Sequence, residues 1–411
     1  MRISEVEQRL IKRIASRFGR RARQGESPNM GMRQGFSVRG RLLCTRVSSA
    51  LEVGVIVALL VIAGLYAASA LDDEGLQDYG SFIASGSAAV EGRNPYGEDE
   101  PLVLVQPVAG SDPVRNPNLN PPISVLGFSA LARFDPTKGL MWWRVATLLM
   151  HLAAIALAAA SARMRIPKPR FAWALAVFCL WETVRWGQVY AIVEVLVALA
   201  LLGLLRKRPT TAGAAIGLAV AIKPNLALWL LALLAARQYR AFISAALAFL
   251  VAWAIPLAVY GAEIYLQWID AARSYAGALR NANGSIPSLM ALLGASRLMS
   301  YGIAGTLTAG TLVLVWRRPG NLDLANETGL ALSILAAPVA WAGYSILLVP
   351  SLLTRSWDRA TRVAIVLLLS PWAIPLWPAG WPLLILLIRS LWVLARGASQ
   401  TQAATSRAEP E

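Results

Sequence analysis

The sequence predicts an all-α, polytopic membrane protein, and three observations support this fold class. Hydrophobic residues make up 56% of the 411 residues, and the mean hydropathy of +0.53 is far above that of a typical soluble domain. Apolar runs of roughly 20 residues recur along the chain, and a run of that length crosses a bilayer as a helix. Short clusters of arginine and lysine separate these runs, as is typical of cytoplasmic loops.

The charge and the cysteine usage exclude several other classes. The net charge of +16 does not indicate a nucleic-acid partner, because topology signals account for the spacing of the basic residues. The chain has a single histidine and two cysteines, Cys44 and Cys179. One cysteine flanks an apolar run and the other lies inside one, so we expect neither a disulfide nor a Cys/His metal site.

The N-terminal part predicts the orientation in the membrane. Residues 1–47 are rich in arginine and form a basic cytoplasmic tail, which we expect to be mainly disordered, with an amphipathic helix over 3–18 as the alternative. They are not a cleavable signal peptide, because the apolar run that follows is long enough to span. The first span, 48–70, exits to the outside. Residues 71–120 are therefore a large first extracytoplasmic loop.

The transmembrane domain covers 48–396 and contains roughly eleven to thirteen spans, with the helix that starts at Pro121 and Pro122 as the main ambiguity. Residues 261–287 form a second outer loop. Residues 397–411 are a polar C-terminal tail, which we also expect to be disordered.

Several apolar legs of the chain are short. Between successive basic clusters the chain must cross to the outer side of the membrane and return. Each of these two legs has only roughly 11 to 18 residues, which is short for a helix that crosses a bilayer core of about 30 Å. The turns therefore lie below the outer surface, where polar backbone is tolerated only in a protein-lined or water-filled space. We expect an outward-opening cavity lined by these turns, at residues 181–188, 223–225, 337–341 and 371–381.

The first outer loop holds most of the candidate acids. Asp78 begins a Ser/Ala/Gly-rich stretch, where a carboxylate is either stabilised by a helix dipole or acts as a general base. Composition does not choose between it and its rivals, which are Asp72, Asp73, Glu98, Asp99 and Glu100.

Further candidates lie at the predicted turns. Lys223 precedes Pro224 between two apolar legs; it either snorkels to the surface or contacts a phosphate. Arg185 and Gln188 could converge on the same anion. His151 is predicted to make an interhelical hydrogen bond, and Glu194 either pairs with a cation such as Arg144 or is protonated.

Taken together, the motifs resemble the polyprenyl-phosphate-dependent glycosyltransferases of the GT-C fold, and specifically glycosyltransferase family 87, which includes bacterial mannosyltransferases. The matching pieces cover about 50–350 in the family's order. They are Asp78-Tyr79, Gly92-Arg93-Asn94-Pro95-Tyr96, Pro121-Pro122, Gly187-Gln188, Gly213 with Gly217, Lys223-Pro224, Asn283-Gly284-Ser285 and Ala337-Pro338-Val339-Ala340-Trp341.

The resemblance implies a hexose transfer, with mannose favoured, from a polyprenyl-phosphate-sugar donor to a glycolipid or glycan acceptor, with inversion and without a cofactor. It implies that Asp78 is the general base at the outer face of the plasma (inner) membrane, while Lys223 and Arg93 stabilise the leaving phosphate. The substrate-binding candidates are Tyr79, Arg93, Asn94, Tyr96, Asn120, Arg185, Gln188, Lys223, Asn283, Ser285, Trp341 and Tyr344.

One departure from the family pattern stands out. Family members often carry histidines two or three residues after the tryptophan of the Pro-x-x-Trp turn, where this chain has Gly343 and Tyr344. If a histidine normally contacts the donor phosphate, this chain makes that contact differently, binds another donor or has lost activity. The competing hypotheses are a transporter or flippase of a lipid-linked sugar, whose broken helices would look alike, and a structural subunit of an envelope complex.

Overall fold

The computed structural model describes residues 31–72, 75–97, 104–105, 114–274, 283–318, 322–370, 377 and 380–406. The chain divides into two compact units, Met1–Val57 and Ala58–Glu411, and each is considered by itself. The described part of the first unit is helical throughout.

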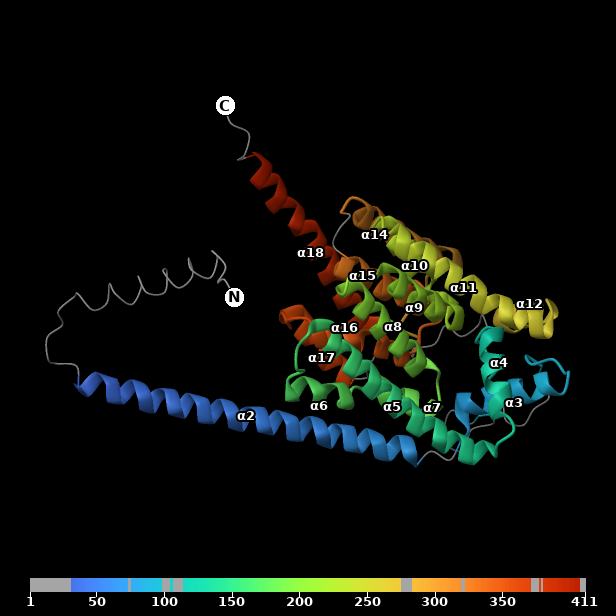
Figure 1. Ribbon diagram of the computed structural model, residues 1–411, viewed down its shortest axis with the longest axis horizontal. Coiled ribbons are helices and arrows are strands. Elements are labelled where there is room, and N and C mark those ends of the chain that lie inside the picture. The colour runs from blue at the N-terminus through green and yellow to red at the C-terminus, as the bar shows by residue number, and fades with distance from the viewer. Residues whose placement is uncertain are drawn as a thin grey trace, which may run out of the picture. The chain divides into compact units, whose positions relative to one another are not determined.

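The described chain is helical apart from one small antiparallel ladder, in which Leu104–Val105 (β1) pairs with Val114–Arg115 (β2). This confirms the predicted all-α class, and the helices are labelled in Figure 1. They are α2 (Gly31–Leu71), α3 (Gln77–Val90), α4 (Pro122–Leu131), α5 (Pro136–Ala162), α6 (Lys168–Ala176), α7 (Phe178–Trp186), α8 (Tyr190–Leu205), α9 (Pro209–Ile222), η2 (Pro224–Leu226), α10 (Ala227–Ala235), α11 (Tyr239–Tyr260), α12 (Glu263–Ser274), α13 (Ile286–Leu292), α14 (Arg297–Trp316), α15 (Leu322–Leu335), η3 (Ala342–Leu348), α16 (Val349–Thr354), α17 (Arg359–Leu369) and α18 (Gly380–Ser406).

The two predicted tails differ from expectation where the structure describes them. Helix α2 already begins at Gly31, and α18 continues to Ser406, so 31–47 and 397–406 are helical rather than disordered. Arginine and leucine recur in the first segment and alanine and glutamine in the second, and these residue types lose little entropy in a helix. Residues 3–18, with their alternative amphipathic helix, lie outside the described part.

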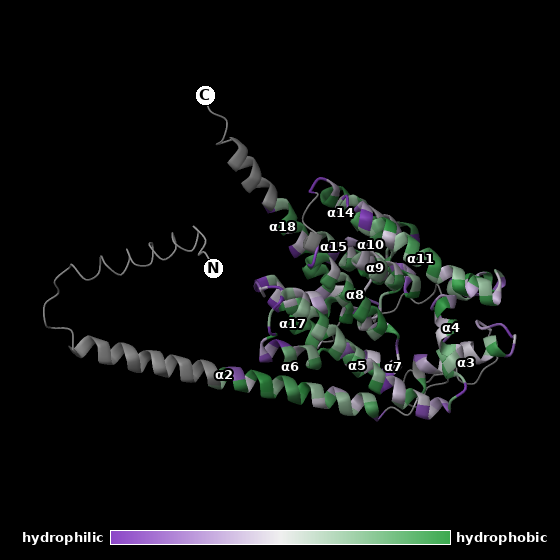
Figure 2. Cartoon of the chain, in the orientation of Figure 1, coloured by the Kyte–Doolittle hydropathy of each residue, from purple (hydrophilic) through white to green (hydrophobic). Residues whose placement is uncertain are grey.

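Four helices are long and apolar enough to cross a membrane: Ala50–Leu71, Pro136–Ala162, Tyr239–Tyr260 and Arg297–Trp316. Figure 2 shows α11 as largely hydrophobic. Apolar side chains of this helix, such as Leu250 and Val251, are exposed at the surface of the chain. Further apolar helices, including α8 and α9, have only 10 to 17 residues. The chain is therefore a membrane protein by its helices, and a count of eleven to thirteen spans stays a prediction.

The helix breaks occur where the sequence predicts turns. Helix α7 ends at Trp186, α9 ends at Ile222 before the 3-10 turn η2, and α15 ends at Leu335. Most of the fourth predicted turn, 371–381, lies outside the described residues.

Helices α9 and α11 cross in direct backbone contact. A Cβ atom placed on Gly213 would lie 2.1 Å from the carbonyl oxygen of Ala241, and one on Gly217 would lie 2.1 Å from that of Ala245. Small residues four apart let two helix backbones approach in this way. The Gly213/Gly217 pair therefore fixes how these two helices pack.

The lone histidine joins α5 to α8, as the sequence predicts. The Nδ1 atom of His151 lies 2.9 Å from the Glu194 carboxylate, and Nε2 lies 3.1 Å from the carbonyl oxygen of Ala174. Glu194 therefore contacts His151, and not Arg144, which the sequence had suggested as its partner. Since Nε2 must donate to a carbonyl, one proton is shared between Nδ1 and the carboxylate, and the pair is neutral overall.

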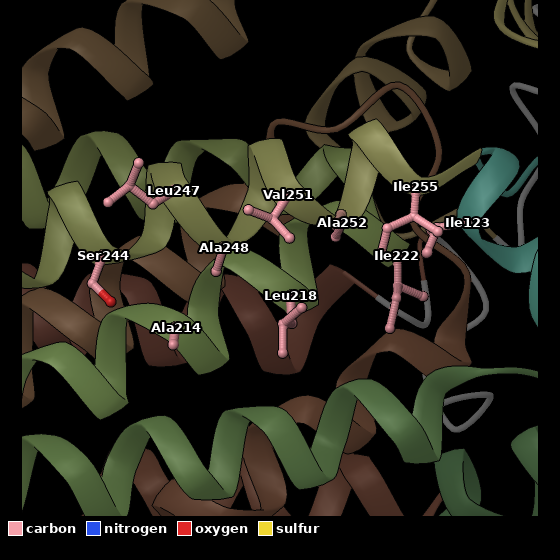
Figure 3. A pocket seen from close by; sticks show the side chains of 11 residues that line it. Ile123, Ala214, Leu218, Ile222, Ser244, Leu247, Ala248, Val251, Ala252 and Ile255 are labelled. Atoms are coloured by element: carbon pink, nitrogen blue, oxygen red, sulfur yellow. The ribbon is translucent and has the colours of Figure 1, made fainter. Parts of the chain in front are cut away.

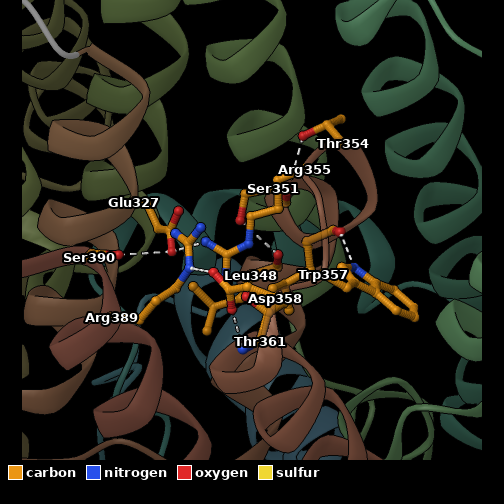
Figure 4. Close-up of polar contacts among 11 residues, drawn as sticks. Glu327, Leu348, Ser351, Thr354, Arg355, Trp357, Asp358, Thr361, Arg389 and Ser390 are labelled. Carbon is orange, nitrogen blue, oxygen red and sulfur yellow. Dashed lines mark hydrogen bonds and ion pairs between the residues drawn. The ribbon is translucent and has the colours of Figure 1, made fainter. Parts of the chain in front are cut away.

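A second polar cluster ties the C-terminal helices together (Figure 4). Arg355 donates to Glu327, which also accepts a hydrogen bond of 3.0 Å from the hydroxyl of Ser390 on α18. Nearby, the Nε atom of Arg389 lies 2.6 Å from Asp358, whose side chain caps the N-terminus of α17. The Arg389–Asp358 ion pair and the Ser390–Glu327 hydrogen bond thus link α18 to segments that precede it.

Candidate active site

The predicted turns and the first outer segment enclose a cavity of about 600 Å³. Its walls come from α3, the segment 116–121, the breaks at 188–190 and 223–225, helix α12, the start of α14, and residues 338–344. Of the predicted site residues, those that line it are Asp78, Asn120, Gln188, Lys223, Trp341 and Tyr344. Segments more than 250 residues apart in the sequence thus meet in one space.

Asp78 lies in the first turn of α3 and reaches this cavity. One carboxylate oxygen accepts a hydrogen bond from the side-chain amide of Asn116, and the other accepts one from that of Gln188. Burial raises the pKa of Asp78 to about 6, although the Asn116 hydrogen bond and the charge of Lys223 both lower it. A carboxylate with its pKa near neutrality suits a general base.

Tyr79, the next residue, does not reach the cavity and instead anchors Asp78. Its side chain is 1% exposed and packs against Phe128 and Trp143. Gly187, which ends α7 with φ +65°, lies against it so closely that an added Cβ atom would be 2.6 Å from the Cβ atom of Tyr79. The glycine therefore serves both the left-handed turn and the close approach that brings Gln188 to Asp78.

Lys223 occupies the break between α9 and η2 and is 9% exposed. Its ammonium group lies 4.7 Å from the ring centre of Tyr190 and 5.5 Å from that of Tyr344. Two aromatic faces hold the cation in place. The cavity thus contains a buried carboxylate and a buried ammonium group that interact with each other.

Two polar atoms of the cavity-lining residues make no hydrogen bond within the described chain. They are the Oε1 atom of Gln188, whose Nε2 atom is taken by Asp78, and the Nδ2 atom of Asn225. Leaving a buried donor or acceptor unpaired costs about 1 to 3 kcal/mol. Both atoms are shielded from solvent within the cavity wall, so a ligand in the cavity does not reach them in this arrangement.

The structure also shows what Gly343 and Tyr344 do at the two positions after the Pro-x-x-Trp turn where family members often carry histidines. A Cβ atom on Gly343 would lie 2.7 Å from the ring of Tyr190, so that ring occupies the space of any side chain there. Tyr344 packs its ring 4.5 Å from the ring of Tyr190, centre to centre. Both positions therefore build the aromatic cage around Lys223.

The Gly92–Tyr96 turn forms as predicted but lies outside the main cavity. Arg93 pairs with Glu91 at 2.7 Å and is 44% exposed. The side chain of Asn94 accepts a hydrogen bond from the backbone of Tyr96, whose hydroxyl donates to the carbonyl oxygen of Asn120 at 2.8 Å. Arg93, Asn94 and Tyr96 line a separate pocket of about 90 Å³. Their role as substrate ligands stays a prediction.

Three other candidates do not line the main cavity. Arg185 is exposed at the end of α7. Asn283 forms a bridge with Trp341 and holds the 338–341 turn, with hydrogen bonds to Pro338 and Ala340. Ser285 is fully buried and caps α13. Asn283 and Ser285 thus support the cavity wall.

Of the rival acids, Asp72 is exposed at the end of α2, and Asp73 and 98–100 lie outside the described residues. Sequence reasoning missed several residues that line the cavity. They are Asn116, Tyr190, Asn225, Trp268, Arg273, Arg297 and Tyr301. The first five lie in the predicted outer loops or at or beside predicted turns, a position that alone does not select a residue, and Arg297 and Tyr301 lie in neither.

Comparison with known proteins agrees with the resemblance. No curated protein and no solved structure matches the chain. A family model for glycosyltransferase family 87 matches residues 118–371, a segment that contains Gln188, Lys223 and Trp341 and begins after Asp78. The match covers more than half of the sequence, so the chain belongs to glycosyltransferase family 87 and is a glycosyltransferase by membership.

Proposed function

We propose that this protein transfers a hexose, with mannose favoured, from a polyprenyl-phosphate-sugar to a hydroxyl group of a lipid or envelope glycan. The observation that carries the proposal is the buried Asp78 carboxylate, held by two amides and facing Lys223 across one cavity. The architecture is then of the GT-C type, and the bilayer supplies the donor.

Asp78 accepts the proton of the acceptor hydroxyl, whose oxygen attacks the anomeric carbon of the donor sugar. The bond between that carbon and the phosphate oxygen breaks, and the phosphate leaves with the electron pair, so the configuration inverts. Lys223 stabilises the negative charge that grows on the leaving phosphate. A phosphate ester is already activated, so the reaction requires no cofactor.

The basic clusters between the apolar helices support a cytoplasmic N-terminus and an active site at the outer face of the plasma (inner) membrane. Arg163, Arg165 and Lys168 follow α5, and Arg206, Lys207 and Arg208 follow α8. Asp78 follows α2, at the opposite end of that helix from the basic tail.

The test is sugar transfer in lipid nanodiscs with a radiolabelled polyprenyl-phosphate-hexose and a glycolipid acceptor. Asp78→Asn keeps the shape of the side chain and removes the base, so we expect transfer to fall by about 10² to 10⁴. The matched control is Asp72→Asn, at an exposed acid, which keeps wild-type rates. Undiminished transfer by Asp78→Asn would remove Asp78 from the mechanism. Movement of intact donor across the bilayer without covalent transfer would instead favour a flippase.

A further inference from the structure

Trp268 is an aromatic side chain of the main cavity that the proposed mechanism does not use. It lies on α12, is partly exposed, and lines the cavity together with Ile269 and Ala272 of the same helix. Another described hollow, between α9 and α11 (Figure 3), is lined by apolar side chains except for Ser244. A sugar ring needs an apolar surface beside polar groups, and of these two spaces only the main cavity offers both.

The ring of Trp268 is held in one orientation. Its indole N–H donates to the carbonyl oxygen of Leu119 at 3.0 Å, and its ring meets that of Trp253 edge to face, with centroids 5.8 Å apart. It also packs against a buried cluster that contains Tyr96, whose hydroxyl donates to the backbone of Asn120. The turn that ends at Tyr96 therefore supports the ring. A ring fixed in this way loses little side-chain entropy when it binds a ligand.

Trp268 lies on the side of the cavity that holds the base. Asn116 donates to the Asp78 carboxylate. Leu119, three residues further along, accepts the indole hydrogen bond, and a chain of three residues reaches at most about 11 Å. The acceptor hydroxyl must come within reach of Asp78, so the wall that Trp268 forms faces the acceptor.

Trp341, the other tryptophan that lines the described part of the cavity, lies on the phosphate side. Its carbonyl oxygen accepts a hydrogen bond of 3.0 Å from the backbone N–H of Tyr344. The ring of Tyr344 lies 5.5 Å from the ammonium group of Lys223. Since Lys223 holds the donor phosphate under the proposed function, Trp341 adjoins the donor and Trp268 is left for the acceptor.

We propose that the acceptor is a glycan whose sugar ring stacks on Trp268, an inference that rests on the proposed function for the transfer itself. A hydroxyl of this ring gives its proton to Asp78, and its oxygen bonds to the anomeric carbon of the donor while the phosphate leaves with the electron pair of the broken bond. The face of an aromatic ring is negative and attracts the partly positive C–H groups on one face of a pyranose. A plain lipid alcohol has no such face, so the enzyme prefers a sugar hydroxyl.

The experiment compares an alkyl hexoside with the alkanol of the same chain length as acceptors in nanodiscs, with a polyprenyl-phosphate-hexose as donor. We expect the wild type to use the hexoside with a kcat/KM at least about tenfold higher. Trp268→Leu removes the ring and should raise the KM for the hexoside at least about tenfold, with the KM for the donor unchanged. Trp268→Phe keeps a ring and loses the indole hydrogen bond, so it should retain most of the affinity. The matched control is Trp142→Leu, at an exposed tryptophan of α5, which keeps wild-type values.

The split between these readouts separates stacking from a structural role. A purely structural tryptophan would lower the kcat and the Tm in Trp268→Phe as much as in Trp268→Leu. That result, equal use of hexoside and alkanol by the wild type, or an equal rise of both KM values in Trp268→Leu would overturn the proposal.

A second variant and a binding readout distinguish this proposal from the proposed function. Ala272→Trp, at an exposed lining position one helical turn from Trp268, fills the space beside the ring, whereas Leu266→Trp changes an exposed residue of α12 outside the described lining. A diazirine-bearing alkyl hexoside should label α12 in the wild type and in Leu266→Trp, but not in Ala272→Trp. Labelling without any sugar transfer would refute the function and keep the binding site. Transfer to the hexoside without labelling of α12 would refute the site and keep the function.

Discussion

Under the proposed mechanism, the acid limb of the pH–rate profile reports the ionisation of Asp78. The base works only as the carboxylate, so activity falls as the pH falls through its pKa. Since burial raises that pKa to about 6, the ionised fraction is about 0.9 at pH 7 and about 0.1 at pH 5. We expect kcat/KM to fall about tenfold between these two values.

Removing the positive charge of Lys223 should move the acid limb of the profile to higher pH. Lys223 lowers the pKa of Asp78, so Lys223→Met raises that pKa and shifts the midpoint of the limb to higher pH. It also lowers the rate at every pH, because the leaving phosphate loses its cation. The control is Lys138→Met, at an exposed lysine near the start of α5, which leaves the midpoint in place.

The assay is the initial rate at low donor concentration from about pH 3 to about pH 8, in nanodiscs of constant lipid composition. A midpoint at the ordinary value for an aspartate, about 3.9, would refute the claim that burial tunes this base. An unchanged midpoint in Lys223→Met would refute the electrostatic link between the two groups.

Three further predictions test the scaffold. Gly217→Ala forces a Cβ atom against the backbone of α11, so it should destabilise the protein by about 1 to 3 kcal/mol. The measurement is the Tm in detergent, which should fall. The control is Gly310→Ala, where the added Cβ atom meets open space and the Tm should stay unchanged. Gly343→Ala forces a Cβ atom against the buried ring of Tyr190 and moves that ring relative to Lys223. It should lower kcat/KM and, through overpacking, also the Tm; a wild-type rate would contradict the cage. Glu194→Ala leaves His151 without its carboxylate and should cost about 3 to 5 kcal/mol by thermal unfolding, whereas Glu194→Gln, which can still bond the imidazole, should cost less.

The sequence predicted the helix breaks because their signals are local. A lysine and a proline in the middle of an apolar run, as at Lys223-Pro224, are costly inside a helix and so mark its end. The turn at 181–188 was predicted from the spacing of the basic clusters, and in the structure Gly187 ends the helix there with a positive φ. Side chains at such breaks had to face a polar space, and both Gln188 and Lys223 do.

The partners of Asp78 were less accessible to sequence reasoning. Asn116 is 38 residues away, near the end of the predicted first outer loop, and nothing in its local pattern says which side chain it meets. Conversely, Asn283 and Ser285 gave a clear motif, but their hydrogen bonds serve the turn and the helix cap. A polar motif beside a cavity does not reveal whether it supports the wall or faces the ligand.

The amide of Gln188 has one orientation, because its nitrogen donates to Asp78 and its oxygen is left over. That oxygen can only accept, and it is shielded from solvent within the cavity wall. Gln188→Glu would set a second carboxylate against Asp78, whereas the amide donates a hydrogen to it. The residue type at position 188 therefore decides how easily the neighbouring acid ionises.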